Sequence, residues 1–371
     1  MTMRAERTKR ARYMEWAKTR SAARFNLATS GMVSVAIAEF PLDVGALEVT
    51  MAGAYGYPPL LERIGRHEGV GADCVVTAAG TSMANHLVFA AVLEPGDEVL
   101  IEQPTYGPLL DLARYFGARV KRLPRRFEDG FAIDVAEVER AITRETRLVV
   151  VTNLHNPSSA SIGAETLGAI GEVAQRVGAR VLVDEAYREV VFDGSAPSAF
   201  RIGEQLGGEN PFIVTTSLTK AYGLSGLRCG WILAAPELAR RMWLLNDLFA
   251  ANNAHPAERM SVMAVDHLEQ FRARTHALLS ANRPLLDAFL DSRGDLECFR
   301  PPHGTVVFPR LMRGDPDALF ATLREKYQTT VVPGEFFEMP QHFRLGISGN
   351  TGELRDGLER LSAPLNELAL L

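Results

Sequence analysis

Short apolar runs rich in β-branched residues alternate with helical stretches from about Ala72 to Ala235, and this rhythm restricts the fold more than any other feature. Strands that are apolar along their whole length are buried on both faces, as in parallel sheets covered by helices. We therefore predict an α/β fold with a mostly parallel, seven-stranded sheet sandwiched by helices. Its strands are expected at Cys74–Ala78, Glu98–Ile101, Val120–Leu123, Leu148–Thr152, Val181–Val183, Phe212–Thr215 and Gly230–Leu233.

After about Trp243 the pattern changes to long helical stretches and then to a short α+β region. Strands are expected there at Val306–Pro309, Thr330–Val332 and Phe343–Ile347. The change predicts a large domain at residues 46–245. A smaller α+β domain is expected from residues 246–371 together with the N-terminal segment, residues 1–45.

Bulk composition excludes several function classes without naming a partner. A net charge of -5 and a pI near 6.0 give no overall attraction to nucleic acid or to anionic membranes. No run approaches the ~20 apolar residues of a membrane span, and the N-terminus lacks the apolar core of a secretory signal. The three cysteines, Cys74, Cys229 and Cys298, are too widely spaced for a zinc motif or a disulfide framework. We therefore expect a cytoplasmic protein without a metal site.

The first 24 residues are basic, with eight Lys or Arg against Glu6 and Glu15. A transit peptide or a phosphate-binding arm would carry such a charge. Because Met14, Trp16 and Ala17 interleave with the charges, we expect a surface helix with a solvated polar face.

A lysine follows the apolar strand PFIVTT, in the window SLTKAYGLSGLRCGW. The carboxyl ends of parallel strands form a crevice, in which partial desolvation favours a neutral amine that can form an imine with an aldehyde. We therefore single out Lys220. Ser217 and Arg228 lie close by in the sequence, and their hydroxyl and guanidinium groups suit a phosphate. A surface lysine beside a glycine turn is the alternative.

The window VLVDEAY ends another buried strand with an acid, Asp184. This carboxylate could cap a helix, or it could pair with a protonated pyridine nitrogen and so keep a ring cationic. Tyr187 could direct its hydroxyl at a ring oxygen. The acid after one strand and the lysine after the next favour the second interpretation.

The window TNLHNPSS follows a further strand. Asn156 before a proline could simply begin a turn, or its amide could donate to the phenolic oxygen of a cofactor. His155 is expected to be structural, because no orienting partner for a catalytic histidine lies near it in the sequence.

Three more positions are candidates for binding. Thr81 and Ser82 follow Gly80 at the start of an apolar helix, where free N–H groups attract an anion; a plain helix cap is the alternative. Tyr106 follows a strand and could stack on a flat ring. Arg344 lies in the apolar strand Phe343–Ile347, where it needs an anionic partner, either an internal acid or a substrate carboxylate.

In order along the chain, these windows resemble the class I/II aminotransferase family, the fold-type I enzymes that use pyridoxal 5'-phosphate (PLP). SLTKAYGLSGLRCGW is similar to that family's SxxK...GxRxG signature, DEAY to its Asp-x-x-Tyr and NLHNPSS to its Asn-Pro-x-Gly loop. The resemblance covers about Gly31 to Ser348. It implies a PLP-dependent transferase-like fold with PLP as the cofactor.

The resemblance also implies a role for each matching position. Lys220 would hold PLP as a Schiff base and move the α-proton of the substrate, while Asp184 would hold the pyridine nitrogen. The remaining ring contacts would come from Tyr187, Asn156 and Tyr106, and the phosphate contacts from Thr81, Ser82, Ser217 and Arg228. The substrate carboxylate would be bound by Arg344, Asn156 and the backbone at Gly31 in LATSGM.

A homodimer with shared active sites is a further implication, in which Tyr55 of one subunit, or Tyr57, reaches the phosphate bound by the other. Two positions depart from the family pattern. Ser159 occupies the glycine position of the Asn-Pro-x-Gly loop, and residues 301–305, PPHGT, replace a more glycine-rich approach to a strand.

The family implies transfer of an amino group between an α-amino acid and a 2-oxo acid. Relatives use the same residues for C–S elimination and other chemistry, so a PLP-dependent lyase or a specialised biosynthetic cyclase is the alternative. A non-enzymatic sensor domain of a transcription regulator is less consistent with the sequence. Only about thirty residues precede LATSGM, which is too few for a winged-helix domain. Asn252, Asn253 and His303 are candidates for lining the substrate pocket.

Overall fold

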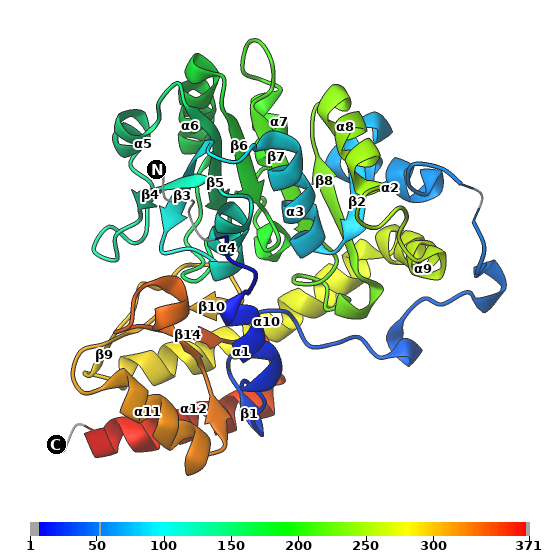
Figure 1. The fold of residues 1–371 in the computed structure, drawn as a ribbon. Coiled ribbons are helices and arrows are strands. Elements are labelled where there is room, and N and C mark those ends of the chain that lie inside the picture. Colours follow the sequence, from blue (N-terminus) through cyan, green and yellow to red (C-terminus); the bar gives the residue numbers. More distant parts are fainter. Residues whose placement is uncertain (1–6, 52, 369–371) are drawn as a thin grey trace.

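A seven-stranded sheet forms the upper part of the molecule in the computed structural model, which describes residues 7–51 and 53–368 (Figure 1). Strand β8 runs antiparallel to both of its neighbours, and all other pairs are parallel. From edge to edge the order is β2 (Val75–Ala79), β8 (Cys229–Leu233), β7 (Phe212–Ser217), β6 (Arg180–Asp184), β5 (Thr146–Thr152), β3 (Glu98–Gln103) and β4 (Arg119–Pro124). The predicted α/β fold with a mostly parallel seven-stranded sheet is confirmed.

The antiparallel strand β8 brings two sequence windows to the same end of the sheet, the end at which the parallel strands finish. The carboxyl ends of β2, β3, β5, β6 and β7 all lie at this end of the sheet, because these strands run in the same direction. Strand β8 runs the other way, so its amino end lies there too, next to the end of β7. Arg228, just before β8, is thereby placed beside Ser217, the last residue of β7.

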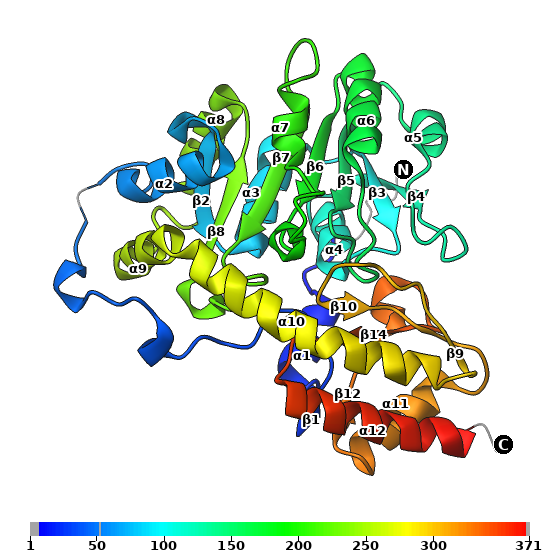
Figure 2. The same ribbon diagram turned by 180° about the vertical axis from the view of Figure 1, so that it is seen from behind.

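Helices cover both faces of the sheet, as expected for strands that are buried on both sides (Figures 1 and 2). One face carries α3 (Thr81–Val92) and α4 (Gly107–Tyr115), which pack together, with α8 (Pro236–Asn246) against α3. The other face carries α5 (Val135–Ala141), α6 (Ala164–Val177) and α7 (Ala199–Gly203). Prolines in the first turn begin α4 and α8, and Gly178 in the left-handed conformation ends α6.

A second group of short strands and long helices lies below the sheet (Figure 1). Its central three-stranded sheet has the order β10 (Val306–Val307), β14 (Phe343–Gly346) and β13 (Val332–Pro333). Around it lie α11 (Pro316–Glu325) and α12 (Thr351–Leu368), the hairpin of β9 (Leu296–Glu297) with β11 (Arg310–Leu311), and the 3-10 turn η6 (Gly334–Phe337). The 24-residue helix α10 (Leu268–Asp291) runs from the sheet into this lower part (Figure 2).

The N-terminal segment lies between the two parts. Helix α1 (Arg12–Thr19) packs on α4, and β1 (Phe25–Asn26) pairs in parallel with β12 (Thr329–Thr330) of the lower part. Helix α9 (His255–Asp266) packs on α2 (Pro58–Glu68) beside the sheet, although it follows the predicted boundary at residue 245. The division into residues 46–245 and the remainder stays a prediction.

Two further findings concern membranes and metals. None of the helices in the described ranges is long and apolar enough to cross a membrane. Within the same ranges, no group of three or more His, Cys, Asp or Glu residues is arranged to hold a metal ion.

Candidate active site

A pocket of about 170 Å³ opens at the end of the sheet where the carboxyl ends of the parallel strands lie. Nine of the residues singled out from the sequence line it: Thr81, Ser82, Tyr106, Asn156, Asp184, Tyr187, Ser217, Lys220 and Arg228. Gly31 and Arg344 lie just behind this lining. A Cβ atom on Gly31 would be 3.5 Å from Lys220 Cδ, and Arg344 is hydrogen-bonded to Asn156.

Lys220 follows β7, and a serine that the sequence analysis overlooked holds its amine. The Nζ atom donates to Ser30 Oγ at 3.1 Å, and the same oxygen accepts the Tyr187 hydroxyl at 2.8 Å. Burial lowers the pKa of Lys220 below its ordinary value, with the positive charge of Arg344 acting in the same direction. Ser30 stands beside Gly31 in LATSGM, and its hydroxyl next to that predicted binding residue is the sequence signal that could have indicated it.

Asp184 ends β6, the neighbouring strand, and a second overlooked residue holds its carboxylate. Asn85 Nδ2 donates to Asp184 Oδ2 at 2.9 Å, and Asn85 is itself fixed by Thr215, whose hydroxyl donates to Asn85 Oδ1 at 2.6 Å. Burial raises the pKa of Asp184, and the bond from Asn85 opposes that rise. Asn85 lies one helical turn after Thr81 and therefore on the same face of α3.

Thr81 and Ser82 begin α3, and Arg228 approaches this helix start over a glycine. The guanidinium Nη2 of Arg228 donates to Ala79 O at 3.0 Å, and a Cβ atom on Gly80 would lie only 2.5 Å from Nη2. Among the described residues no carboxylate lies within 4.0 Å of this guanidinium. A helix N-terminus, two hydroxyls and an uncompensated arginine together form an electropositive cradle.

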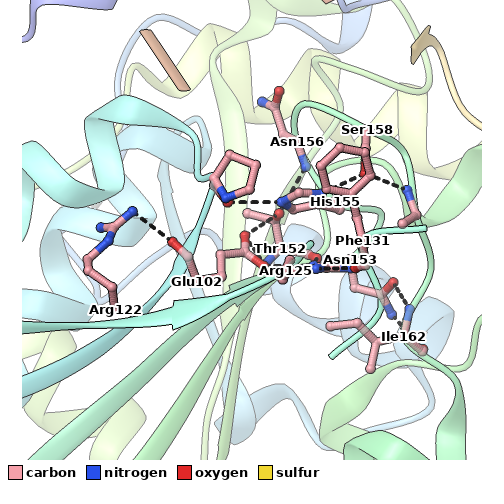
Figure 3. A network of polar contacts seen from close by, with 12 residues as sticks. Glu102, Arg122, Arg125, Phe131, Thr152, Asn153, His155, Asn156, Ser158 and Ile162 are labelled. Carbon is pink, nitrogen blue, oxygen red and sulfur yellow. Dashed lines mark hydrogen bonds and ion pairs between the residues drawn. The ribbon is translucent and has the colours of Figure 1, made fainter. Parts of the chain in front are cut away.

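The loop after β5 carries Asn156, and a buried network fixes its base (Figure 3). Glu102 at the end of β3 accepts bonds from Arg125 Nη1 at 2.7 Å and from the Thr152 hydroxyl at 2.6 Å. Thr152 Oγ1 in turn accepts the Asn156 backbone N–H at 3.0 Å. The Asn156 side chain points away from this network, and its Oδ1 accepts from Arg344.

His155 holds the same loop in place. Its Nδ1 lies 2.6 Å from Ser158 Oγ and its Nε2 lies 3.0 Å from Pro104 O. Burial lowers the pKa of His155 well below its ordinary value. With both ring nitrogens bonded to the protein, His155 has the structural role that the sequence suggested.

Ser159 occupies a left-handed backbone conformation that favours glycine, with φ 60°. Its hydroxyl donates to Val306 O of β10 at 2.8 Å, so it ties the Asn156 loop to the lower part. Gly304 makes room for this contact, because a Cβ atom there would lie 2.3 Å from Ser159 Oγ. The departure from the family's glycine is therefore accompanied by an added bond between the two parts.

Arg344 on β14 is 1% exposed and has no acidic partner. Its guanidinium donates to Asn156 Oδ1 at 2.8 Å, to Tyr13 Oη at 2.8 Å and to Ala28 O at 3.0 Å, while Nε has no hydrogen-bond partner. Within the described chain no carboxylate lies within 4.0 Å of it. An internal acid, one of the two partners considered from the sequence, is thus not found there. A buried charge without a counter-ion costs several kcal/mol, which indicates a site for an anionic ligand.

The N-terminal segment contributes to this site, contrary to the expectation of a surface helix. Its helix exists as α1, but Tyr13 is buried and Met14 lines the pocket. Residues 1–6 of the segment lie outside the described residues. Because α1 is charged on its other faces, its sequence pattern does not reveal that Tyr13 faces inward.

Five other candidates lie away from the pocket lining. Tyr55 is 51% exposed, and its hydroxyl donates to Asp247. Tyr57 accepts a bond from Arg259, and Asn253 donates to Thr77. His303 lies beside Asp193 in a separate crevice, and Asn252 is exposed. The expectation that Asn252, Asn253 and His303 line the pocket is therefore wrong for the single chain.

The residues present fit PLP. The cradle at Arg228, Thr81 and Ser82 lacks a negative charge and matches a phosphate. In the same pocket, the half-buried amine of Lys220 suits an aldehyde, and the buried carboxylate of Asp184 suits a cationic ring nitrogen. This donor set is what the cofactor's phosphate, aldehyde and pyridine groups require.

Comparison with known proteins agrees with this geometry. The family described as "Aminotransferase class I and II" matches residues 55–361. Capreomycidine synthase of Streptomyces vinaceus is 32% identical over 293 residues, which is 78% of this chain and 74% of that protein. An arginine–pyruvate transaminase of Pseudomonas aeruginosa is 29% identical over 83% of this chain and 79% of its own length.

Solved structures share the fold over almost the whole chain. A PLP-dependent aminotransferase from Streptococcus suis has a TM-score of 0.90 at 24% identity and covers 97% of this chain and 99% of its own. The PLP-dependent cyclase OrfR has a TM-score of 0.86 at 26% identity, covering 99% and 100%. This chain is therefore a PLP-dependent enzyme of the class I and II aminotransferase family.

Proposed function

We propose that this enzyme transfers an amino group between an α-amino acid and a 2-oxo acid, with PLP held by Lys220. One observation carries the proposal: Lys220 and Asp184, which lie at the carboxyl ends of neighbouring strands, line one pocket that an uncompensated Arg344 borders. When bound, PLP supplies an electron sink that stabilises negative charge at the α-carbon of an amino acid.

Residues around the pocket would hold the cofactor at three points. Asp184 would keep the ring nitrogen protonated, with Asn85 orienting its carboxylate. Asn156 and Tyr187 would face the phenolic oxygen, and Tyr106 the ring face. The phosphate would be bound by Thr81, Ser82, Ser217 and Arg228.

Lys220 would also move the proton that the reaction requires. Its lowered pKa increases the fraction of neutral amine, which can accept a proton from the substrate α-carbon and return it elsewhere. Ser30 is bonded to both Lys220 and Tyr187, so it would position the amine between these steps.

Arg344 would bind the substrate carboxylate, which makes α-amino acids the substrate class. Two of its five N–H groups have no protein partner, since Asn156, Tyr13 and Ala28 account for three. A carboxylate would supply the missing counter-ion. The Gly31 backbone lies against Lys220, where it could assist.

We further propose a homodimer with shared active sites, located in the cytoplasm. Exposed apolar side chains gather beside the pocket: Phe249 and Tyr115 both pack on His86, and Tyr55 bonds to Asp247, next to exposed Leu248. Such a patch is typical of a protein interface. A second subunit on it would bring its own Tyr55 toward the pocket across the interface.

A PLP-dependent cyclase is the second candidate for the function, and the names of two similar proteins favour it. Capreomycidine synthase and the cyclase OrfR match most of this chain, and their names describe synthesis and ring closure. The pocket residues serve either reaction, because the bond that breaks depends on how the substrate is oriented. C–S elimination by a PLP-dependent lyase is the third candidate.

A half-reaction separates these functions. The holoenzyme is mixed with one amino acid at a time and no 2-oxo acid, beginning with arginine, the donor named for the Pseudomonas relative. Transamination yields one equivalent of 2-oxo acid per active site and then stops until an acceptor such as pyruvate is added. Continued turnover without an acceptor, with release of a cyclic product or of ammonia, would contradict the proposal and favour the cyclase or the lyase.

A further inference from the structure

Tyr13 places its hydroxyl on the guanidinium that we assign to the substrate carboxylate. Arg344 Nη2 donates to Tyr13 Oη at 2.8 Å, although the two residues are 331 positions apart in the sequence. The guanidinium carbon lies 5.6 Å from the centre of the Tyr13 ring. The phenol oxygen therefore stands beside the N–H groups that a carboxylate would use.

The position of the phenol is fixed by aromatic rings from two segments of the chain. Its ring lies 5.5 Å from Tyr106, 5.8 Å from Phe336 and 6.0 Å from Phe337. Tyr106 belongs to the loop before α4, whereas the two phenylalanines belong to η6 of the lower part. This enclosure leaves Tyr13 only 9% exposed and orients its hydroxyl toward Arg344.

The hydroxyl also has an unused donor. The Tyr13 oxygen accepts from Arg344, but among the described residues its own proton has no acceptor. Nε of Arg344 is likewise a buried donor without a partner. Two unsatisfied donors around one uncompensated positive charge match a ligand that carries two negative oxygens.

We propose that Tyr13 is a specificity-determining residue that binds the substrate α-carboxylate together with Arg344. This inference rests on the proposed function. The carboxylate accepts the phenol proton and the free guanidinium protons, so helix α1 forms one wall of the substrate site. An amine that lacks the carboxylate gains nothing from either group and is discriminated against.

The test is Tyr13→Phe, which keeps the ring within its aromatic surroundings and removes only the hydroxyl. KM and kcat are measured for the amino acid that is most active in the half-reaction assay. They are also measured for the amine that differs from it only by loss of the carboxylate; for arginine, this amine is agmatine. We expect KM for the amino acid to rise about tenfold, as for a lost bond to a charged group, with kcat changed much less. The kinetics of the amine should not change.

Two further variants make the result specific. Tyr327→Phe removes a phenol hydroxyl that donates to Glu367 on the surface, and it should leave both substrates unaffected. In an Arg344→Ala background, Tyr13→Phe should have little additional effect, because the two side chains act on one carboxylate. Cofactor absorbance confirms that each variant is loaded.

The outcomes distinguish this inference from the proposed function. If the wild-type enzyme turns over no amino acid, the proposed function fails. If it turns over amino acids but Tyr13→Phe leaves their KM unchanged, lowers it, or affects the amine equally, the role of Tyr13 is overturned while the proposed function stands.

Discussion

Single residues around the pocket act through neighbours that the sequence does not reveal. Asp184 depends on Asn85, Lys220 on Ser30 and Arg344 on Tyr13. Each partner comes from a distant part of the chain, and each is an ordinary polar residue in its local window. Strand-end positions identified Asp184 and Lys220, and a charge within an apolar strand identified Arg344, but only the folded arrangement identifies their partners.

Asn85 provides the first prediction at this scale. Asn85→Leu removes a donor to the Asp184 carboxylate and so raises its pKa further, because the ionised form loses a hydrogen bond. The acid limb of the kcat/KM profile should move to higher pH by about one unit. Asn366→Leu, which alters a surface bond to Arg293, should leave the profile unchanged. An unmoved acid limb in Asn85→Leu would contradict this role.

His342 provides a prediction about stability. Its ring packs between Phe127 and Phe308, neither ring nitrogen has a partner among the described residues, and burial lowers the pKa of His342 to about 4. The unfolded chain therefore binds more protons between pH 4 and 6.5, so the contribution of His342 is complete above about pH 6.5 and is lost as the pH falls.

Urea denaturation of the wild type and of His342→Phe checks this. Between pH 6.5 and about pH 5, the free energy of unfolding of the wild type should fall by about 2 kcal/mol more than that of the variant. Glu185 and Glu258, whose pKa values burial raises to about 7, have the opposite dependence but are present in both proteins. Parallel curves for the two proteins would show that His342 does not titrate this way.

At the scale of elements, the buried ion pair of Glu102 and Arg125 joins β3 to the residue after β4 and, through Thr152, to the Asn156 loop (Figure 3). Removing one charge leaves the other buried without a partner. Glu102→Gln and Arg125→Met should each lower the free energy of unfolding by about 3–5 kcal/mol.

A double-mutant cycle tests this coupling. The combined variant should lose clearly less than the sum of the two single variants, because neither charge is then left alone. Glu145→Gln, which breaks the exposed pair with Arg119, should cost less than about 1 kcal/mol. Additive losses at Glu102 and Arg125 would contradict the coupling.

Elements differ in how far the sequence predicts them. All seven strands of the large sheet were expected within about two residues, because burial on both faces leaves an apolar signature. The two-residue strands β1, β9 and β11 were missed. Strands this short have no periodicity of their own, and they form because distant segments such as Phe25 and Thr329 are brought together. Helix α1 was expected, but its inward face was not.

At the scale of the whole molecule, the proposed shared active site can be tested by mixing inactive subunits. Lys220→Ala and Tyr55→Ala are each expected to have low activity. If Tyr55 acts across the interface, a hybrid dimer contains one site with both native residues, and exchange of equal amounts should restore up to about a quarter of wild-type activity. The kinetic assay of the mixture measures this directly.

A second mixture serves as the control. Lys220 and Asp184 line the same pocket of one chain, so Lys220→Ala mixed with Asp184→Ala produces no intact site and should show no recovery. Absence of recovery in the mixture with Tyr55→Ala, together with a monomeric mass in solution, would contradict the shared site.

The central claim is a covalent bond between PLP and Lys220, and reduction with borohydride followed by peptide mapping tests it most directly. The chain has five lysines, Lys9, Lys18, Lys121, Lys220 and Lys326, so the other four are internal controls. We predict visible cofactor absorbance, about one reduced adduct per chain, located on Lys220, and loss of both absorbance and adduct in Lys220→Ala. An adduct on another lysine, or none in active protein, would contradict the account.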